Sequence, residues 1–221
     1  MFAEPEKRTK VKICGLTTLE DARFVSGALA DYLGFIFYPE SPRYIEPAKA
    51  GAIINWLEGP GKVGVFVNQP LDDVNSIAKQ TGIDYVQLHG NESPDYCALV
   101  EKPIIKAFHI EKDTDPAELI SRVESYLDRV DYLLFDTKSD TEWGGTGQTF
   151  NWNILDEITS DKPFFLSGGL NTNNVQDAIQ TGQPYAIDLS SGLEESPGLK
   201  DFDKIELFFD KMRDIWEEQE L

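Results

Sequence analysis

A cysteine ends the apolar run VKICG at residues 11–15, where a β-branched residue would suit a strand better. Lys12 stands two residues before Cys14, and because side chains alternate along a strand the two share one face. A thiol next to a cation loses its proton more readily than an isolated thiol. Cys14 and Lys12 are therefore candidate catalytic residues, and the reaction they could serve depends on which residues lie at the ends of the other strands.

Other apolar runs of the chain also end in residues that could bind or react. These residues are Arg43, Asn68, His89, Asp136, Gly168, Gly169, Asp188, Ser190, Ser191 and Gly192. Alternation places Asp188 and Ser190 on one face, as it does Gln87 and His89. If the strands close into a barrel, the last strand pairs with the first, and Asp188 becomes the expected counter-charge of a buried Lys12.

Two short turns rich in glycine and serine follow the last two strand-like runs, at 168–169 and 190–192. Neighbouring turns of this kind form the commonest phosphate site of barrel enzymes, because their backbone amides gather around the anion. We interpret them as a phosphate site, with plain strand-to-helix turns as the alternative. The loop WGGTGQTF, at 143–150, is too long for a mere connection. It is interpreted as a flap, with an ordinary surface loop as the alternative.

Three single residues carry weaker signals. Arg43 lies in YPESPRY, where a rigid proline-rich turn could direct its guanidinium at a carboxylate, although a lone loop arginine is more often solvated. His89 is equally consistent with a ligand-contacting residue and with a hydrogen-bonded structural histidine. Cys97, in DYCALV, has the pattern of a small buried apolar residue.

These residues require a scaffold of alternating strands and helices. Strands are expected at 11–15, 32–38, 62–68, 85–90, 103–110, 132–137, 163–169 and 185–191, and helices at 18–29, 46–57, 71–81, 94–101, 116–127, 151–159, 172–181 and 201–218. Ser93, Asp115 and Asn171 are expected to cap helices. Eight βα units predict an α/β fold, a single (β/α)8 TIM barrel with eight parallel strands. An open doubly wound sheet is the alternative, disfavoured because no strand precedes a GxGxxG or GxxxxGK loop.

Composition narrows the class of protein further. One barrel domain is expected over residues 1–221, with a short polar N-terminal extension at 1–10. The 41% hydrophobic content is enough for a sizeable core, while the net charge of −19 opposes contact with nucleic acid or an anionic membrane. The longest apolar run, 32–38, is far shorter than the roughly 20 residues of a membrane helix. The expected partner is therefore a small molecule.

Cysteine and histidine usage gives two more expectations. Cys14 and Cys97 are far apart, and the polar start FAEPEKRTK does not resemble a secretory signal, so a cytoplasmic protein without disulfides is predicted. The two histidines, His89 and His109, form no Cys/His spacing typical of zinc, and no metal is expected.

The motifs taken together resemble the phosphoribosylanthranilate isomerase family, barrel enzymes of tryptophan biosynthesis. The resemblance runs from about Val11 over nearly the whole chain, in KICGLT, GFIFYPESPRY, VGVFVN, VQLHGNE, LLFDT, GGTGQTFNW, LSGGLNTNNV and DLSSGLEESPGLKD. Each motif is modest, but their order and spacing together are specific. Two departures, Glu40 in the loop after 32–38 and AID at 186–188, concern loop detail and leave the implied acid and base untouched.

The resemblance implies an Amadori rearrangement of phosphoribosylanthranilate without a cofactor. It makes Cys14 the general base and Asp136 the general acid, and it assigns Arg43 to the anthranilate carboxylate. His89 and Asp188 are implied to line the pocket, with Lys12 as counter-ion of Asp188, tuner of the thiol, or both. The phosphate site is implied to comprise Gly145, Gly168, Gly169, Ser190, Ser191 and Gly192.

For this assignment, burial is expected to keep a proton on Asp136, and Lys12 to help remove one from Cys14. The expected partner is a phosphorylated small molecule, and the chain is expected to be a monomer or homodimer. Two other interpretations stay open: another sugar-phosphate barrel, such as an indole-glycerol-phosphate synthase or a ribulose-phosphate epimerase, and a catalytically inactive barrel that binds a phosphorylated ligand for regulation.

Overall fold

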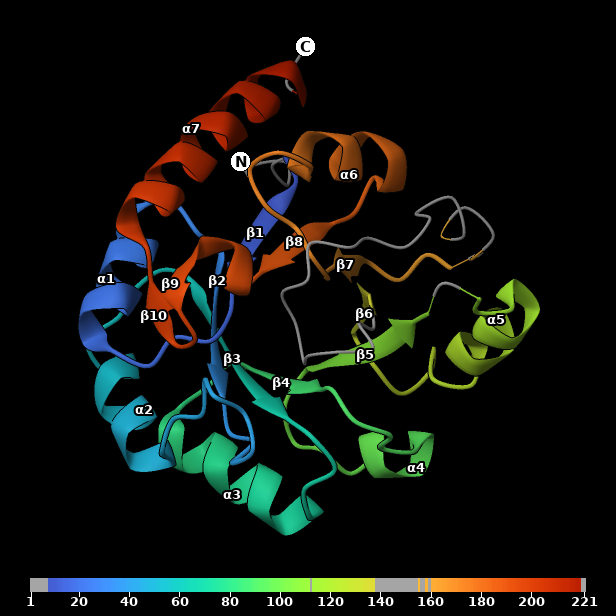
Figure 1. Ribbon diagram of the computed structural model, residues 1–221. Helices are drawn as coiled ribbons and strands as arrows, with labels where there is room; N and C mark the ends of the chain where they lie inside the picture. Colours follow the sequence, from blue (N-terminus) through green and yellow to red (C-terminus); the bar gives the residue numbers. More distant parts are fainter. Residues whose placement is uncertain (1–7, 112, 138–154, 156–157, 159, 220–221) are drawn as a thin grey trace, which may run out of the picture.

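The protein is a closed barrel of eight parallel strands in the computed structural model, which describes residues 8–111, 113–137, 155, 158 and 160–219 (Figure 1). The strands are β1 (Lys10–Ile13), β2 (Tyr32–Ile36), β3 (Gly61–Phe66), β4 (Tyr85–Leu88), β5 (Ile104–Ile110), β6 (Tyr132–Thr137), β7 (Phe164–Leu166) and β8 (Ala186–Leu189). Each strand pairs with the next along the chain, and β1 pairs with β8. The predicted TIM barrel is confirmed, and the open sheet is excluded.

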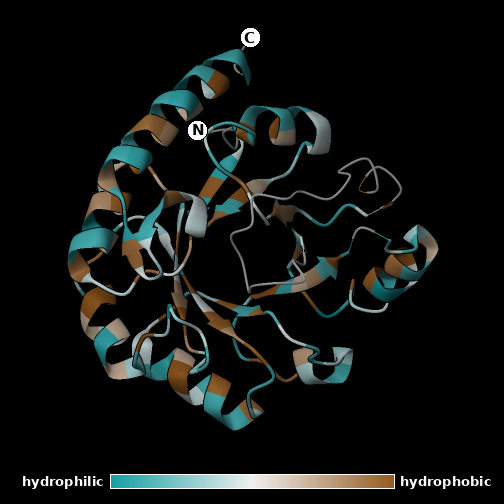
Figure 2. Cartoon of the chain, viewed as in Figure 1, coloured by the Kyte–Doolittle hydropathy of each residue, from teal (hydrophilic) through white to brown (hydrophobic). Residues whose placement is uncertain are grey.

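Helices cover the outside of the barrel between the strands. They are α1 (Leu19–Gly27), α2 (Pro47–Ile54), α3 (Leu71–Thr81), α4 (Pro94–Cys97), α5 (Pro116–Glu124), α6 (Val175–Gly182) and α7 (Phe202–Gln219). Apolar and polar residues alternate along them, as Figure 2 shows for α3 and α7. The helix expected at 151–159 lies mostly outside the described residues.

Two of the predicted helix features differ in the structure. The helix expected at 94–101 ends at Cys97, because residues 99 and 100 turn tightly through bonds from Leu99 N to Tyr96 O and from Val100 N to Cys97 O. Pro103 then prevents helical continuation. Ser93 and Asp115 cap α4 and α5 as predicted.

Asn171 does not cap α6, which begins four residues later than this residue. Its side chain accepts a hydrogen bond from Asn173 N inside the preceding loop, while its own backbone N–H donates to Asn174 Oδ1. Asparagine side chains compete well for backbone groups in turns, so this asparagine-rich segment forms a loop before the helix starts.

The barrel interior has an apolar end and a polar end. Inside lie buried apolar side chains of alternate strand positions, namely Tyr32, Val63, Ile105, Ala107, Leu134, Phe165 and Ala186. Tyr85, Tyr132 and Tyr185 pack around them through aromatic contacts at the amino ends of the strands. The carboxyl ends carry the ionisable groups, as expected for barrel enzymes.

The chain near each end of the sequence contributes to the barrel. Lys10 begins β1, and buried Thr9 accepts a hydrogen bond from Trp216 Nε1 of α7 at 2.9 Å. The described part of the segment expected as a polar extension, residues 8–10, is thus packed against the fold. No helix among the described residues is both long and apolar enough to cross a membrane.

A small hairpin that the sequence analysis did not predict follows the last barrel strand. After a single 3-10 turn, η2 (Ser191–Leu193), the strands β9 (Glu194–Ser196) and β10 (Leu199–Lys200) pair antiparallel. Gly198 has φ of +83°, a backbone conformation that suits glycine at this turn. The hairpin returns Lys200 to the mouth of the barrel beside β1.

Candidate active site

Strand register brings the predicted site residues together at the carboxyl end of the barrel. Lys12 of β1 lies opposite Asp188 of β8, and His109 of β5 lies opposite Asp136 of β6. His89, just after β4, is bonded through its backbone N–H to Phe66 O of β3. The inward faces of five strands therefore supply a cation, two carboxylates, a thiol and two imidazoles.

Lys12 and Asp188 form the ion pair that the sequence analysis predicts. Lys12 Nζ lies 2.7 Å from Asp188 Oδ2, and the Lys12 side chain is fully buried. Burial alone would lower the pKa of Lys12, but attraction to Asp188 and Cys14 outweighs it and raises the pKa, so the ammonium stays charged. Asp188 Oδ1 is buried and has no hydrogen-bond partner among the described residues.

Cys14 is buried at the mouth of the barrel beside this pair. Burial raises the pKa of its thiol, and the opposing attraction of Lys12 and Lys200 is too small to reverse the effect. The expectation that Lys12 depresses the thiol pKa is therefore right in its direction but wrong in its outcome. The cysteine backbone is firmly held, because its carbonyl accepts bonds from Lys200 Nζ at 2.7 Å and Ser190 Oγ at 3.2 Å.

Asp136 lies next to both histidines of the chain. Its Oδ2 atom is 3.3 Å from His89 Nε2 and 3.8 Å from His109 Nδ1. Burial would raise the pKa of Asp136, but the hydrogen bond and charge of His89, together with His109 and Ser167, hold it below its usual value. Burial therefore acts in the expected direction, but the expectation of a protonated carboxyl group is wrong in its outcome, because the two imidazoles favour the carboxylate.

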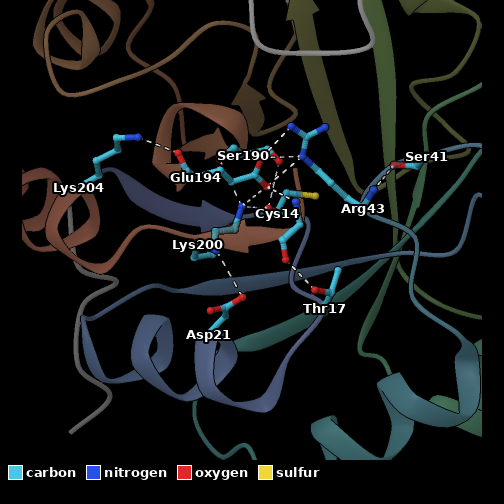
Figure 3. Close-up of polar contacts among 10 residues, drawn as sticks. Cys14, Thr17, Asp21, Ser41, Arg43, Ser190, Glu194, Lys200 and Lys204 are labelled. Atoms are coloured by element: carbon cyan, nitrogen blue, oxygen red, sulfur yellow. Dashed lines mark hydrogen bonds and ion pairs between the residues drawn. The ribbon is translucent and has the colours of Figure 1, made fainter. Parts of the chain in front are cut away.

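Arg43 points into a buried charge cluster that the sequence analysis missed (Figure 3). Its Nε and Nη2 atoms donate to the carboxylate of Glu194, with the shortest contact at 2.7 Å. Glu194 also accepts from Lys200 Nζ at 2.8 Å. Burial opposes ionisation of Glu194, but the two cations outweigh it and lower its pKa. The cluster carries one net positive charge, which suits an anionic group of a ligand.

The cluster also joins three loops of the barrel mouth. Lys200 Nζ donates to the carbonyls of Cys14 and Ser190, and Lys204 Nζ of α7 donates to Glu194 O. Thr17 Oγ1, in the loop after β1, donates to the carbonyl of Gly198 at 2.6 Å. These contacts fix the end of β1 to the hairpin (Figure 3). The turn signal in EESPGLK could have indicated this hairpin.

The predicted phosphate loops lie in contact with each other. Gly168 and Gly169 have φ of +93° and +65°, and a Cβ atom on Gly168 would lie 2.4 Å from Thr137 N, so only glycine fits there. A Cβ atom on Gly192 would lie 2.4 Å from Leu170 O, which shows how closely the loops after β7 and β8 approach. Gly145 lies outside the described residues.

Hydrogen bonds from neighbouring side chains hold the backbone of these loops in position. The carbonyl of Gly169 accepts bonds from the side-chain amides of Asn171 and Asn174 at 3.1 and 3.0 Å. Ser190 Oγ donates to the carbonyl of Cys14, and Ser191 begins the 3-10 turn η2. The hydroxyl of Ser190 thus supports the end of β1.

Fold and site together define a (β/α)8-barrel enzyme whose ionisable side chains and glycine-rich loops meet at the carboxyl ends of the strands. Residues 11–211 match the sequence model of N-(5'phosphoribosyl)anthranilate (PRA) isomerase. The N-(5'-phosphoribosyl)anthranilate isomerase of Geobacter metallireducens is 44% identical over 200 residues, which cover 90% of this chain and 96% of that protein. The chain belongs to the N-(5'-phosphoribosyl)anthranilate isomerase family.

Solved structures agree with this assignment. The crystal structure of phosphoribosyl anthranilate isomerase from Thermotoga maritima has a TM-score of 0.83 at 37% identity, and the match covers 93% of this chain and 99% of that one. A phosphoribosyl anthranilate isomerase in complex with reduced 1-(o-carboxyphenylamino)-1-deoxyribulose 5-phosphate has a TM-score of 0.80 at 35% identity, with the same coverage. The resemblance noted in the motifs is confirmed.

Proposed function

We propose that this isomerase converts N-(5-phosphoribosyl)anthranilate into 1-(2-carboxyphenylamino)-1-deoxyribulose 5-phosphate, the Amadori step of tryptophan biosynthesis, by general acid and base catalysis. The observation that carries the proposal is one barrel mouth that contains a thiol, Cys14, and a carboxyl group, Asp136, both within electrostatic reach of the Lys12–Asp188 pair. The reaction needs one acid and one base, and these two groups supply them.

Asp136 is the general acid and Cys14 the general base. Asp136 protonates the ring oxygen, the bond from that oxygen to C1' breaks, and the nitrogen lone pair forms an iminium ion. Cys14 then removes the proton on C2', and the electron pair of that bond moves to give an enolamine. The enolamine gains a proton at C1' and loses one from the 2'-oxygen to become the ketone. Atoms and electrons balance within the substrate, so no cofactor is required.

The substrate itself helps to place the protons. The contacts of the chain alone favour a thiol at Cys14 and a carboxylate at Asp136. A phosphate and a carboxylate bound nearby raise the pKa of Asp136, since like charges favour its neutral form. Once the iminium ion has formed, its positive charge favours the thiolate of Cys14. Each proton transfer is thus promoted by the charge of the species that precedes it.

Different residues are proposed to bind the two ends of the substrate. Arg43 is proposed to hold the anthranilate carboxylate through Nη1, because Nε and Nη2 already donate to Glu194. The loops at 168–169 and 190–192 are proposed to bind the phosphate through backbone amides. Asp188 Oδ1 is proposed to accept a ribose hydroxyl, which would supply the partner that this buried oxygen lacks among the described residues.

One assay tests the proposal. Phosphoribosylanthranilate is generated in solution with the purified chain, and the loss of anthranilate-type fluorescence is followed, with the histidine-pathway aminoaldose phosphate as second substrate. We expect rapid conversion of the first substrate. A chain that binds it without turnover would support the inactive regulatory barrel instead. Turnover of other sugar phosphates alone would support one of the related barrel enzymes.

Replacing Arg43 by Met should raise KM by about 10- to 100-fold and leave kcat nearly unchanged, because a charge-assisted hydrogen bond to the substrate carboxylate is lost. Glu194 keeps its bond to Lys200, so the cluster stays paired. Steady-state kinetics on Arg43→Met and Arg43→Lys measure the effect, and Lys should recover only part of it. A lower kcat with unchanged KM would argue against a binding role.

Replacing Gly34 by Ala should lower kcat by about 10- to 100-fold through displacement of the catalytic thiol. A Cβ atom on Gly34 would lie 2.7 Å from Cys14 Sγ and 2.9 Å from Cys14 Cα, so the strand end must move. Gly27→Ala is the matched control, because a Cβ atom there meets nothing within 4 Å. Equal kcat values for the two variants would contradict the proposed position of the thiol.

A further inference from the structure

The proposed acid and two histidines converge at the ends of three neighbouring strands. His89 Nε2, His109 Nδ1 and Asp136 Oδ2 all lie within 4.8 Å of one another, and each of the three side chains is only partly exposed. The strand register explains the group, since His109 lies directly opposite Asp136 on the inward faces of β5 and β6. The rearrangement proposed above assigns no role to His109.

A hydrogen bond to the backbone determines which ring nitrogen of His109 faces Asp136. His109 Nε2 lies 3.0 Å from the carbonyl oxygen of His89, so it must carry the ring proton and donate it. His109 Nδ1 is therefore a lone pair, and it faces Asp136 Oδ2 at 3.8 Å with no proton fixed between them. Two acceptors that face each other favour a cation between them.

His89 is supported in a similar way. Its Nδ1 atom lies 3.0 Å from the amide nitrogen Nε2 of buried Gln87, and a half-turn of that amide presents the oxygen in its place when Nε2 of His89 binds a metal. With the oxygen presented, Nδ1 carries the proton and Nε2 becomes a lone pair directed at Asp136. Imidazoles whose second nitrogen is held by a neutral acceptor are typical of metal ligands.

We propose that His89, His109 and Asp136 bind one divalent transition-metal ion of the zinc type, and that this ion inhibits the isomerase. Two imidazoles and one carboxylate are ligands that Zn²⁺ and Co²⁺ prefer. Metal–ligand bonds of about 2.0–2.2 Å at a tetrahedral ion separate the ligand atoms by about 3.3 Å. The His89–Asp136 distance already has this value, and the His109–Asp136 distance needs to shorten by a few tenths of an ångström.

The surrounding charges permit a cation here. The nearby cations Lys12 and Lys106 are each neutralised by a carboxylate, Asp188 at 2.7 Å and Glu92 at 3.0 Å. With neutral imidazoles, the three ligands carry the single negative charge of Asp136. The inhibitory half of the proposal rests on the proposed function, because a metal on Asp136 removes the carboxyl group that must protonate the ring oxygen.

Metal binding is tested first, without reference to activity. Calorimetric titration of the purified protein with Zn²⁺, and the visible absorption of added Co²⁺, should show one site with nitrogen and oxygen ligands. His109→Ala should weaken Zn²⁺ binding by at least about 10- to 100-fold. Cys14→Ala should bind Zn²⁺ as tightly as the unchanged protein, which separates this site from the nearby thiol. No stoichiometric binding, equal affinity in His109→Ala, or loss of binding in Cys14→Ala would each overturn the site.

Inhibition is tested second, as the ratio of initial rates with and without Zn²⁺ in each variant. We expect this ratio to fall toward zero in the unchanged protein as Zn²⁺ saturates the site and to recover with a chelator, and to stay close to one in His109→Ala. Stoichiometric binding without inhibition would overturn the inhibitory half and would speak against Asp136 as the acid. A protein that binds Zn²⁺ but never turns over phosphoribosylanthranilate would instead overturn the proposed function and leave the metal site standing.

Discussion

Replacing Asp136 by Asn should lower kcat by about 10²- to 10⁴-fold, because an amide of the same shape cannot deliver a proton to the ring oxygen in the transition state. Binding should persist, since the proposed carboxylate and phosphate contacts are those of Arg43 and of the loops after β7 and β8. Single-turnover kinetics and substrate titration separate the two effects. A variant whose KM rises while kcat holds would show that Asp136 binds the substrate and does not protonate it.

The matched control for this change is Asp131→Asn, at the residue just before the amino end of β6. Asp131 Oδ2 accepts a hydrogen bond from Ile104 N at 2.8 Å near the amino end of the barrel. The substitution is chemically identical but remote from the polar end of the interior. We expect kcat close to that of the unchanged protein. A comparable loss in both variants would mean that the Asp136→Asn effect arises from a general change in the barrel.

The sequence is sufficient to predict the barrel and the Lys12–Asp188 pair, because both follow from regular patterns. Eight apolar runs at even spacing define the strands, and alternation along β1 and β8 together with closure of the barrel sets the two charges opposite each other. The caps at Ser93 and Asp115 are also local properties. Prediction from sequence succeeds for features that depend on residues close in the chain, such as helix caps, or on a regular spacing of apolar residues, such as strands.

Prediction fails where the outcome depends on contacts between distant segments. In the sequence Arg43 is a lone loop arginine, because its partner Glu194 lies 151 residues away on a separate hairpin. The low pKa of Asp136 reflects two histidines from other strands, and His109 becomes visible as a neighbour only once β5 and β6 are aligned. Burial of a carboxyl group can be predicted from sequence. The hydrogen bonds that counteract the effect of burial on its pKa cannot.

Replacing Lys12 by Met should reduce the free energy of unfolding by about 3–5 kcal/mol at pH 7, because the carboxylate of Asp188 is left buried without its counter-charge. Met has nearly the length of Lys and fills the same space, so lost packing contributes little. Urea unfolding followed by fluorescence measures the change. Adding Asp188→Asn to Lys12→Met removes the stranded charge, and we expect the double variant to regain most of the loss.

The destabilisation of Lys12→Met should also depend on pH with a definite sign. Even beside Lys12, burial holds the pKa of Asp188 above its usual value, and without the opposing charge of Lys12 this pKa rises further, so between these two pKa values the folded variant binds more protons than the folded unchanged protein. Stability relative to the unchanged protein therefore falls as pH rises through the range between those two pKa values. Unfolding free energies at pH 5 should differ less than those at pH 8. A gap that stays constant, or widens toward acid, would mean that Asp188 keeps its charge through another partner and that Lys12 does not hold it ionised.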